Sequence, residues 1–387
     1  INKFDFKKYK DSTEDISKMV SKYLMEHGFL TKRLAKAFPN IKMKLRKLFA
    51  VLMCVFAISS IYAQRVNLKI GSVAPDNSPW AIEQKKIAQE WLKLTNGQVN
   101  LTFMSASALG GEAGVIQKMR VARPGQKAPL DGGIFTNIGV YELAPKSNIL
   151  TLCVPFMFRD QEELTLVLEE TQNEINAAIE EQGFVLLGWF NVGWAYFFTK
   201  EEVRTPTQLK NVSLSVGGIT SPELGRAFQH AGYKTDDVPN EKILSSLKSN
   251  NGCGGLYTIP MYAYAAQYSK HANYVLGLPI CPVMGGFVVN KNVWASIPEK
   301  NREVIMANIH DAEQKFIEIQ QENDNKYLAK IESEGGVITK LTDAERAVFE
   351  EDLYNDAIRM GESKETNVIN FDFFKRIDAI LQKHRGR

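Results

Sequence analysis

Aromatic and amide side chains, the residue types that bind small molecules, gather in two stretches of the chain. The first stretch carries Trp189, Phe190, Asn191, Trp194 and Tyr196, and the second carries Tyr257, Met261, Tyr262 and Tyr264. Pockets for small molecules combine apolar and aromatic walls with a few polar atoms that fix the orientation of the ligand. The same pattern also suits the buried cores of two sheets, so both interpretations stay open at this point.

Residues that could carry out catalysis form no recognisable constellation. The glycine-rich residues 110–114 lack the Gly-Lys-Ser/Thr ending of a phosphate-binding loop and the spacing of a dinucleotide fingerprint. The chain has no Gly-x-Ser-x-Gly elbow, and His310 beside Asp311 falls in a helical pattern typical of a solvent-facing surface. The sequence therefore predicts a protein that is not an enzyme, and it indicates no cofactor.

The cysteines also lack the spacing of a chemical site. Cys153, Cys253 and Cys281 follow residue 63 without a Cys-x-x-Cys pair or a histidine at ligand spacing. We therefore expect buried, small hydrophobic residues and no metal site. One disulfide is compatible with an oxidising compartment, and it would leave one thiol unpaired.

The elements that position these residues follow an α/β pattern. Residues 66–70 and 99–103 alternate between apolar and polar side chains, which predicts two strands, and Ser78-Pro79 between them predicts the start of a helix. The apolar run 184–190 is typical of a buried central strand. Strand, helix and strand in succession favour a parallel α/β sheet.

Helix signals are equally clear in the second half of the chain. Thr205-Pro206 with Gln208, and Asp160 with Glu163, have the spacing of capping boxes. Apolar residues spaced by three and four over Val304–Glu334 predict one amphipathic helix. At 1.5 Å per residue this helix is about 45 Å long, which exceeds one small lobe, so we expect it to lie across two.

Composition and charge restrict the class of protein. At 387 residues, with 44% apolar and 24% charged residues, the chain is expected to fold into two globular lobes. Residues 1–63 hold an excess of about eight basic residues, so the remainder is mildly acidic. A weakly acidic body without a basic stripe excludes nucleic-acid binding as the predicted function.

The basic excess at the start of the chain includes a predicted signal peptide. Met43–Lys47 is a basic segment, residues 48–58 form a short apolar run, and Ile61-Tyr62-Ala63 resembles a cleavage site. We therefore expect residues 43–63 to direct secretion, with cleavage near Ala63 and a periplasmic mature protein. An uncleaved anchor and a lipoprotein modified at Cys54 remain alternatives, and the upstream segment 1–42 is left out of the fold argument.

Four motifs in order give the chain a family resemblance over residues 66–360. They are Val73–Trp80, Leu109–Glu112, Val154–Asp160 and Arg204–Asn211, and Pro-Phe-Met-Phe-Arg-Asp in the third is the most specific. Together they resemble the solute receptors of TRAP transporters, the DctP type. The resemblance implies two α/β lobes that close over a ligand, with a long helix spanning both lobes.

The chain departs from this family where the ligand would bind. Receptors of this type normally carry an arginine whose fork binds a substrate carboxylate, and the matching position here is Ser215. A second arginine is replaced by Ala195, and an acidic stretch reads Cys253-Gly254-Gly255-Leu256. Burying a carboxylate without a partner costs several kcal/mol, which makes an organic acid an unfavourable ligand. The chain looks like the arginine-lacking subgroup associated with a periplasmic tetratricopeptide-repeat protein.

The resemblance and the residues together predict an extracytoplasmic solute-binding receptor. It would capture a small apolar or uncharged ligand in a hydrophobic pocket and deliver it to membrane permease subunits. Three residues are assigned roles: Ser215 as a hydroxyl partner where the arginine is missing, Trp194 as a stacking wall, and Asn137 as an amide donor from the opposite lobe. The predicted ligand-binding residues are Trp80, Asn137, Phe156, Phe158, Trp194, Ser215, Tyr257 and Tyr262.

The expected lobes are built from separate stretches of the chain. Lobe I would comprise residues 64–190 with part of 275–310, and lobe II residues 191–274 with part of 311–387, including the long helix. The alternatives are a partner-docking scaffold that has lost its ligand, a carboxylate-binding receptor, and an enzyme on the same fold. A cleft filled by side chains would favour the scaffold, and a base within reach of a nucleophile would favour the enzyme.

Overall fold

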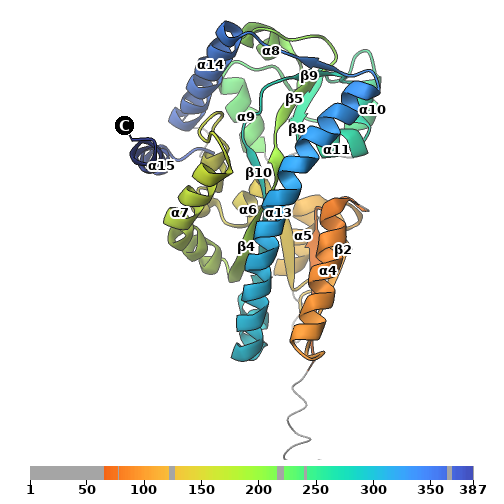
Figure 1. Cartoon of the computed structure of the whole chain (residues 1–387), viewed down its shortest axis with the longest axis vertical. Coiled ribbons are helices and arrows are strands. Elements are labelled where there is room, and N and C mark those ends of the chain that lie inside the picture. Colours follow the sequence, from red (N-terminus) through yellow and green to blue (C-terminus); the bar gives the residue numbers. More distant parts are fainter. Residues whose placement is uncertain are drawn as a thin grey trace, which may run out of the picture. The chain divides into compact units, whose positions relative to one another are not determined.

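Two β-sheets, each flanked by helices, make up the part of the chain that the structure describes (Figure 1). This computed structural model describes residues 65–76, 78–121, 127–215, 222–238, 242–363 and 368–386. The predicted signal peptide 43–63 and the upstream segment 1–42 lie outside these residues.

The first sheet is mixed, and its helices cover both of its faces. Its strands, in spatial order, are β2 (Val99–Ser105), β1 (Val66–Ser72), β3 (Gly132–Thr136), β10 (Pro282–Asn290) and β4 (Phe184–Trp194). The strand β1 runs parallel to β2 and β3, whereas β10 runs antiparallel to β3 and β4. Besides the long helix described below, the helices in contact with these strands include α4 (Pro79–Leu94), α5 (Gly111–Arg120), α6 (Asn137–Leu143), α7 (Gln161–Glu181) and α12 (Lys291–Ser296).

The second sheet is built from shorter strands. In spatial order these are β11 (Val337–Thr339), β9 (Tyr274–Leu276), β5 (Tyr196–Thr199), β8 (Gly255–Thr258), β6 (Leu214–Ser215) and β7 (Thr235–Asp236). The helices connecting them are α8 (Pro206–Asn211), α9 (Pro222–His230), α10 (Ile243–Lys248) and α11 (Pro260–Ala265). Below, each sheet with its helices is called a lobe, the first or the second.

The helix starts follow from local capping chemistry. The Ser78 hydroxyl accepts a hydrogen bond from the backbone three residues on, and Thr205 with Gln208 forms a complete capping box. These two predictions are confirmed, because cap residues satisfy backbone N–H groups within their own turn. At α7 only half of the predicted box forms: Asp160 accepts from the Glu163 N–H, but the Glu163 carboxylate accepts from the N–H of Arg159.

Two extended segments connect the lobes, and these segments run side by side. The strand β4 continues to Trp194, past residue 190 where we expected the first lobe to end, and the chain enters β5 of the second sheet at Tyr196. The return segment leaves β9 and enters β10 after Cys281. Backbone hydrogen bonds of 2.9 Å join the two crossings, from the Ala195 N–H to the Cys281 carbonyl and from the Ile280 N–H to the Ala195 carbonyl.

The first crossing depends on one glycine. Gly193 has φ of 146°, and a Cβ atom there would lie 2.8 Å from Oδ1 of Asp324. Asp324 is buried in a long helix and accepts a hydrogen bond of 3.0 Å from the Trp194 N–H. A larger residue at position 193 would therefore force the crossing away from this helix.

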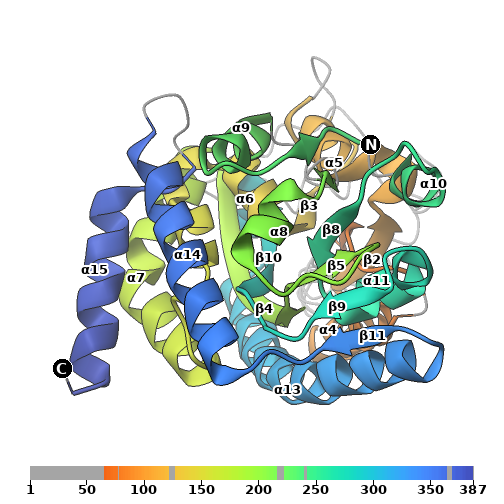
Figure 2. The ribbon, with the colours of Figure 1, turned by 90° about the horizontal axis from the view of Figure 1, so that it is seen from above.

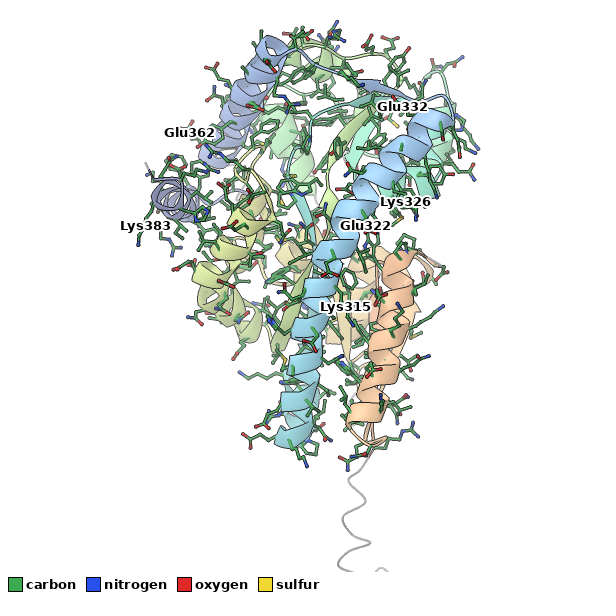
Figure 3. All side chains as sticks on the ribbon, in the orientation of Figure 1. Lys315, Glu322, Lys326, Glu332, Glu362 and Lys383 are labelled. Carbon is green, nitrogen blue, oxygen red and sulfur yellow. The ribbon has the colours of Figure 1, made fainter. Side chains whose placement is uncertain are left out.

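That helix, α13 (Glu299–Ser333), contacts both lobes (Figure 1). Its 35 residues make it about 52 Å long, and it begins five residues before the predicted start at Val304. It contacts β4 and α4 of the first lobe, and α11 and β11 of the second. Figure 3 labels exposed charged residues along its outer face, including Lys315 and Glu332.

The last two helices contact different lobes. The helix α14 (Asp343–Glu362) contacts α8 and α9 of the second lobe, whereas α15 (Phe371–His384) contacts α7 of the first (Figure 2). Arg385, after α15, forms a two-pronged ion pair with Glu163, with both N···O distances 2.7 Å. The C-terminal residues thus return to the first lobe after α14 has packed on the second.

Candidate functional site: a cavity between the two sheets

A cavity of about 330 Å³ lies between the lobes and is lined from both of them. The walls are mostly apolar and aromatic. They include Trp80, Phe103, Phe190, Phe197, Phe228, Tyr257 and Tyr262. This volume and lining are typical of a site that encloses a small molecule.

Five of the eight predicted ligand-binding residues line this cavity. Asn137 and Trp80 come from the first lobe, and Ser215, Tyr257 and Tyr262 come from the second. The two lobes therefore face one another across the cavity through residues that the sequence placed in one site.

The other three predicted residues do not line it. Phe158 is 5% exposed and packs in the core beside α7. Phe156 is half-buried at φ of 59°, with its N–H donated to the Ile280 carbonyl at 3.0 Å. Trp194 lies in the interlobe crossing and packs against the core. Its backbone N–H donates a hydrogen bond to the Asp324 carboxylate. The structure thus places Trp194 outside the cavity for which we expected it to form a stacking wall.

Ser215 offers an unused hydrogen-bonding group. Its strand β6 pairs with β8, which buries the side chain to 5% exposure. Its hydroxyl has no hydrogen-bond partner among the described residues, and the buried indole N–H of Trp80 also has none. Both atoms have almost no accessible surface, so a ligand could bond to them only if the wall shifts; such a bond would remove the cost of burying them without a partner.

Asn137 is already largely occupied by its neighbours. Its side-chain carbonyl accepts from the Met284 N–H at 2.8 Å, and its amide donates to Sγ of Cys153 at 3.1 Å. These bonds fix the amide at the start of α6, on the side of the cavity opposite Ser215. One amide hydrogen remains for a ligand.

Glu112 contributes a buried carboxyl group at the start of α5. Its oxygens accept hydrogen bonds from the N–H and the hydroxyl of Thr136, at 2.6 and 2.9 Å. Burial raises the pKa of Glu112 to about 7, although both Thr136 hydrogen bonds lower it. The part of its surface that stays accessible borders the cavity, so near neutral pH this wall holds a carboxyl group in both protonation states.

Asp356 supplies the second acidic group of the wall, and it is fully engaged. It is 1% exposed in α14, pairs with the ammonium of Lys210, and accepts from the Tyr233 hydroxyl at 2.9 Å. Burial, followed by the charge of Asp356, raises the pKa of Tyr233. This network holds α8, α9 and α14 together behind the cavity.

The described wall of the cavity contains no arginine, lysine or histidine. Ser215 and Ala195, where the motif resemblance led us to expect the substituted arginines, both line it. Of its ionisable acids, Asp356 pairs with Lys210, and Glu112, with a pKa of about 7, is ionised in only part of the molecules near neutral pH. The described wall therefore offers no positive charge and at most a partial negative one.

Sequence reasoning missed three groups of this wall. Glu112 belongs to the glycine-rich motif 109–112, and a carboxylate directly after two glycines at a helix start was the available signal. Cys153 and Cys281 had no such signal, because residues far apart in the chain meet there.

Among the described residues no group of three or more His, Cys, Asp and Glu side chains could hold a metal ion. None of the described helices is long and apolar enough to cross a membrane.

Several solved structures with a similar fold are periplasmic solute-binding proteins. The TRAP periplasmic solute-binding protein of Ralstonia eutropha H16, solved with bound (S)-2-acetolactate, superimposes with a TM-score of 0.70 at 20% identity, covering 82% of this chain and 99% of that one. A sugar acid binding protein of Advenella mimigardefordensis in complex with galactonate gives a TM-score of 0.71 at 14% identity, with 83% and 99% covered. A solute-binding protein of Roseobacter denitrificans is 22% identical over 261 residues, covering 66% of this chain and 77% of its own length.

A family match covers most of the chain and confirms the resemblance seen in the motifs. Residues 70–363 match the DctP family, described as bacterial extracellular solute-binding protein, family 7. The two-lobed fold agrees with the TRAP receptor structures. This chain belongs to the DctP family of TRAP-type solute-binding proteins.

Proposed function

We propose that this protein is the extracytoplasmic receptor of a TRAP-type transporter and that its cavity binds a small apolar or uncharged solute. It would work in the periplasm after cleavage of the signal peptide near Ala63, and pass its ligand to membrane permease subunits. We further assign it to the subgroup that lacks the arginine and is associated with a periplasmic tetratricopeptide-repeat protein.

The absence of a basic side chain from the described cavity wall carries this proposal. The relatives solved with acetolactate and galactonate hold carboxylates. A carboxylate in this cavity would lose its hydration without gaining an ion pair, at a cost of several kcal/mol. An apolar ligand carries no such cost and would gain about 25 cal/mol for each Å² of surface it buries.

The polar atoms of the wall indicate what else the ligand would carry. The Ser215 hydroxyl of the second lobe and the Trp80 indole N–H of the first lobe have no hydrogen-bond partner among the described residues. A ligand with an apolar body and a carbonyl or hydroxyl group would satisfy them. Because the two donors belong to different lobes, such a ligand would favour the closed arrangement.

The eight residues predicted from the sequence divide into two groups within this proposal. Trp80, Asn137, Ser215, Tyr257 and Tyr262 would contact the ligand, because they line the cavity. Phe156, Phe158 and Trp194 would position the wall from behind. The unfilled cavity supports a ligand-binding receptor over a docking scaffold, whose cleft would hold side chains.

Extraction of the purified protein would test the ligand class first. The mature chain is purified, extracted with organic solvent, and the extract is identified by mass spectrometry. A stoichiometric apolar or uncharged compound would support the proposal. A bound organic acid would overturn it, and a repeatedly empty protein would favour the docking scaffold.

A charge-gain variant tests the position of Ser215. Ser215→Arg would restore the fork that binds carboxylates, and we expect succinate or galactonate to bind at least about tenfold more tightly, equivalent to 1.4 kcal/mol. Ser245→Arg adds the same charge at an exposed site on α10 of the same lobe and should change nothing. A folded Ser215→Arg protein without any gain in calorimetric titrations would show that Ser215 does not face the ligand.

A further inference from the structure

Two thiols meet in the wall of the cavity. Cys153 ends a short 3₁₀ helix, Ile149–Cys153, and Cys281 precedes β10 in the return crossing between the lobes. Both residues line the cavity, and Cys281 lies near enough to raise the pKa of the Cys153 thiol. The structure shows both as free thiols.

The surrounding backbone holds the two cysteines in this position. The Phe156 N–H donates to the Ile280 carbonyl at 3.0 Å, which joins the two segments next to the thiols. The Asn137 amide donates to the Cys153 sulfur, and Ala195 binds the Cys281 carbonyl. These bonds hold the two segments that carry the cysteines next to each other.

We propose that Cys153 and Cys281 are a redox pair in the ligand cavity that closes to a disulfide on reaction with a small disulfide compound. One protein thiolate attacks the small disulfide, breaks its S–S bond and releases one of its halves as a thiol. The second protein thiolate then displaces the other half. The protein dithiol is oxidised to a disulfide, the reagent is reduced to two thiols, and the protons of the protein thiols pass to them.

The reaction would change the site at the joint between the lobes. The bond would tie the segment before α7 covalently to the return crossing and remove two thiol hydrogens from the wall. Tyr257 of the second lobe lies beside this pair: burial raises the pKa of its phenol, and the charges of Cys281 and Cys153 raise it further. A disulfide would therefore alter both the crossing and the wall that Tyr257 completes.

The environment of Cys153 sets the conditions for the reaction. The hydrogen bond with Cys281, followed by burial, raises the pKa of the Cys153 thiol. Since the thiolate is the reactive form, cross-linking should accelerate as the pH is raised from about 7 to 9.

Peptide mapping of the full chain tests the pair directly. The folded protein is incubated with glutathione disulfide, remaining thiols are alkylated after denaturation, and the protein is digested with trypsin. We expect most of Cys153 in peptide Ser147–Arg159 linked to peptide His271–Lys291, which contains Cys281. The linked product weighs two hydrogen atoms less than the sum of the two peptides.

Matched variants distinguish a pair from unrelated reactive thiols. Cys253 is also buried, and Cys253→Ser should leave the linked peptide unchanged. Cys153→Ser and Cys281→Ser should each leave a stable mixed disulfide with glutathione on the remaining partner, because no second thiol can displace it. Recovery of Cys153 and Cys281 only as separate alkylated or glutathione-bearing peptides, or linked to other cysteines, would overturn the proposal.

Discussion

Replacing Glu112 by glutamine tests the buried carboxyl group of the cavity. Glutamine has the same shape, its carbonyl can accept from the Thr136 N–H, and its amide can donate to the Thr136 hydroxyl. The variant therefore resembles the protonated form of Glu112 at every pH. We expect the wild-type chain to lose stability relative to this variant as the pH rises.

The size and the sign of this stability difference follow from the pKa of Glu112. Burial raises the pKa of Glu112 from 4.5 to about 7 in the folded protein, so the folded state holds a proton that the unfolded state has lost between these values. Stability contributed by this group is thus present at low pH and falls as the pH passes from about 4.5 to 7. At 1.36 kcal/mol per unit the full difference is at most about 3 kcal/mol.

Urea unfolding of ligand-free protein at a series of pH values measures this difference. The free energy of unfolding of Glu112→Gln minus that of the wild type should rise by up to about 3 kcal/mol from pH 4.5 to pH 8. Glu322→Gln removes an exposed carboxylate from the outer face of α13 (Figure 3) and should give no comparable slope. A flat difference for Glu112→Gln, or one that falls with pH, would refute the assigned burial of this carboxyl.

Two further substitutions test how the lobes are held. Burial raises the pKa of Asp324 to about 6, so ionisation of this carboxyl group destabilises the folded state as the pH rises from about 4 to 6. In the same urea assay, the free energy of unfolding of Asp324→Asn should exceed that of the wild type by up to about 3 kcal/mol at pH 7.5. This difference should disappear at pH 4. An equal effect at both pH values would contradict the burial of Asp324 against the crossing at Trp194. Arg385→Ala should cost about 3 kcal/mol or more by leaving the Glu163 carboxylate buried and unpaired, and hydrogen exchange should increase mainly in α15. Unchanged exchange there would mean that this ion pair does not hold the helix.

The pair between Arg385 and Glu163 also shows why acid should weaken the protein. Burial alone would raise the pKa of Glu163, but hydrogen bonds from Arg385 and from the Arg159 N–H hold it below its usual range. This contribution is present above the unfolded pKa and is lost as the pH falls through the lower folded value. Glu163 and Glu112 therefore act in opposite directions and in different pH windows.

The sequence was sufficient where the controlling interactions are local. The cap at Ser78, the capping box at Thr205 and the apolar strand from residue 184 were all predicted, because each depends on neighbours within one turn or on one strand face. The long helix was predicted with its start five residues too late, since helix ends are the least determined part of a periodic pattern. The ordered motifs were enough to indicate the DctP family.

Only the tertiary structure decided which side chains border the cavity. Phe156 and Phe158 belong to the most specific motif, yet neither lines the cavity: Phe158 lies in the core and Phe156 packs against it. The direction of a side chain in an irregular segment depends on the packing of distant elements, which no local pattern encodes. The motif therefore identified a segment near the cavity, but it did not identify which side chains of that segment line the cavity.

The chemistry of the cavity is likewise a product of contacts between distant residues. The pKa of Glu112 rises to about 7 because the fold buries its carboxyl group, although the Thr136 hydrogen bonds lower it. Cys153 lies near Cys281 because the interlobe crossing passes beside the segment before α7. The sequence by itself indicated most of the helices and strands and the family, because these depend on local patterns and ordered motifs. The fold alone determined the dielectric surroundings and the neighbours that set each group's pKa and reactivity, because burial and proximity arise only when separate segments pack.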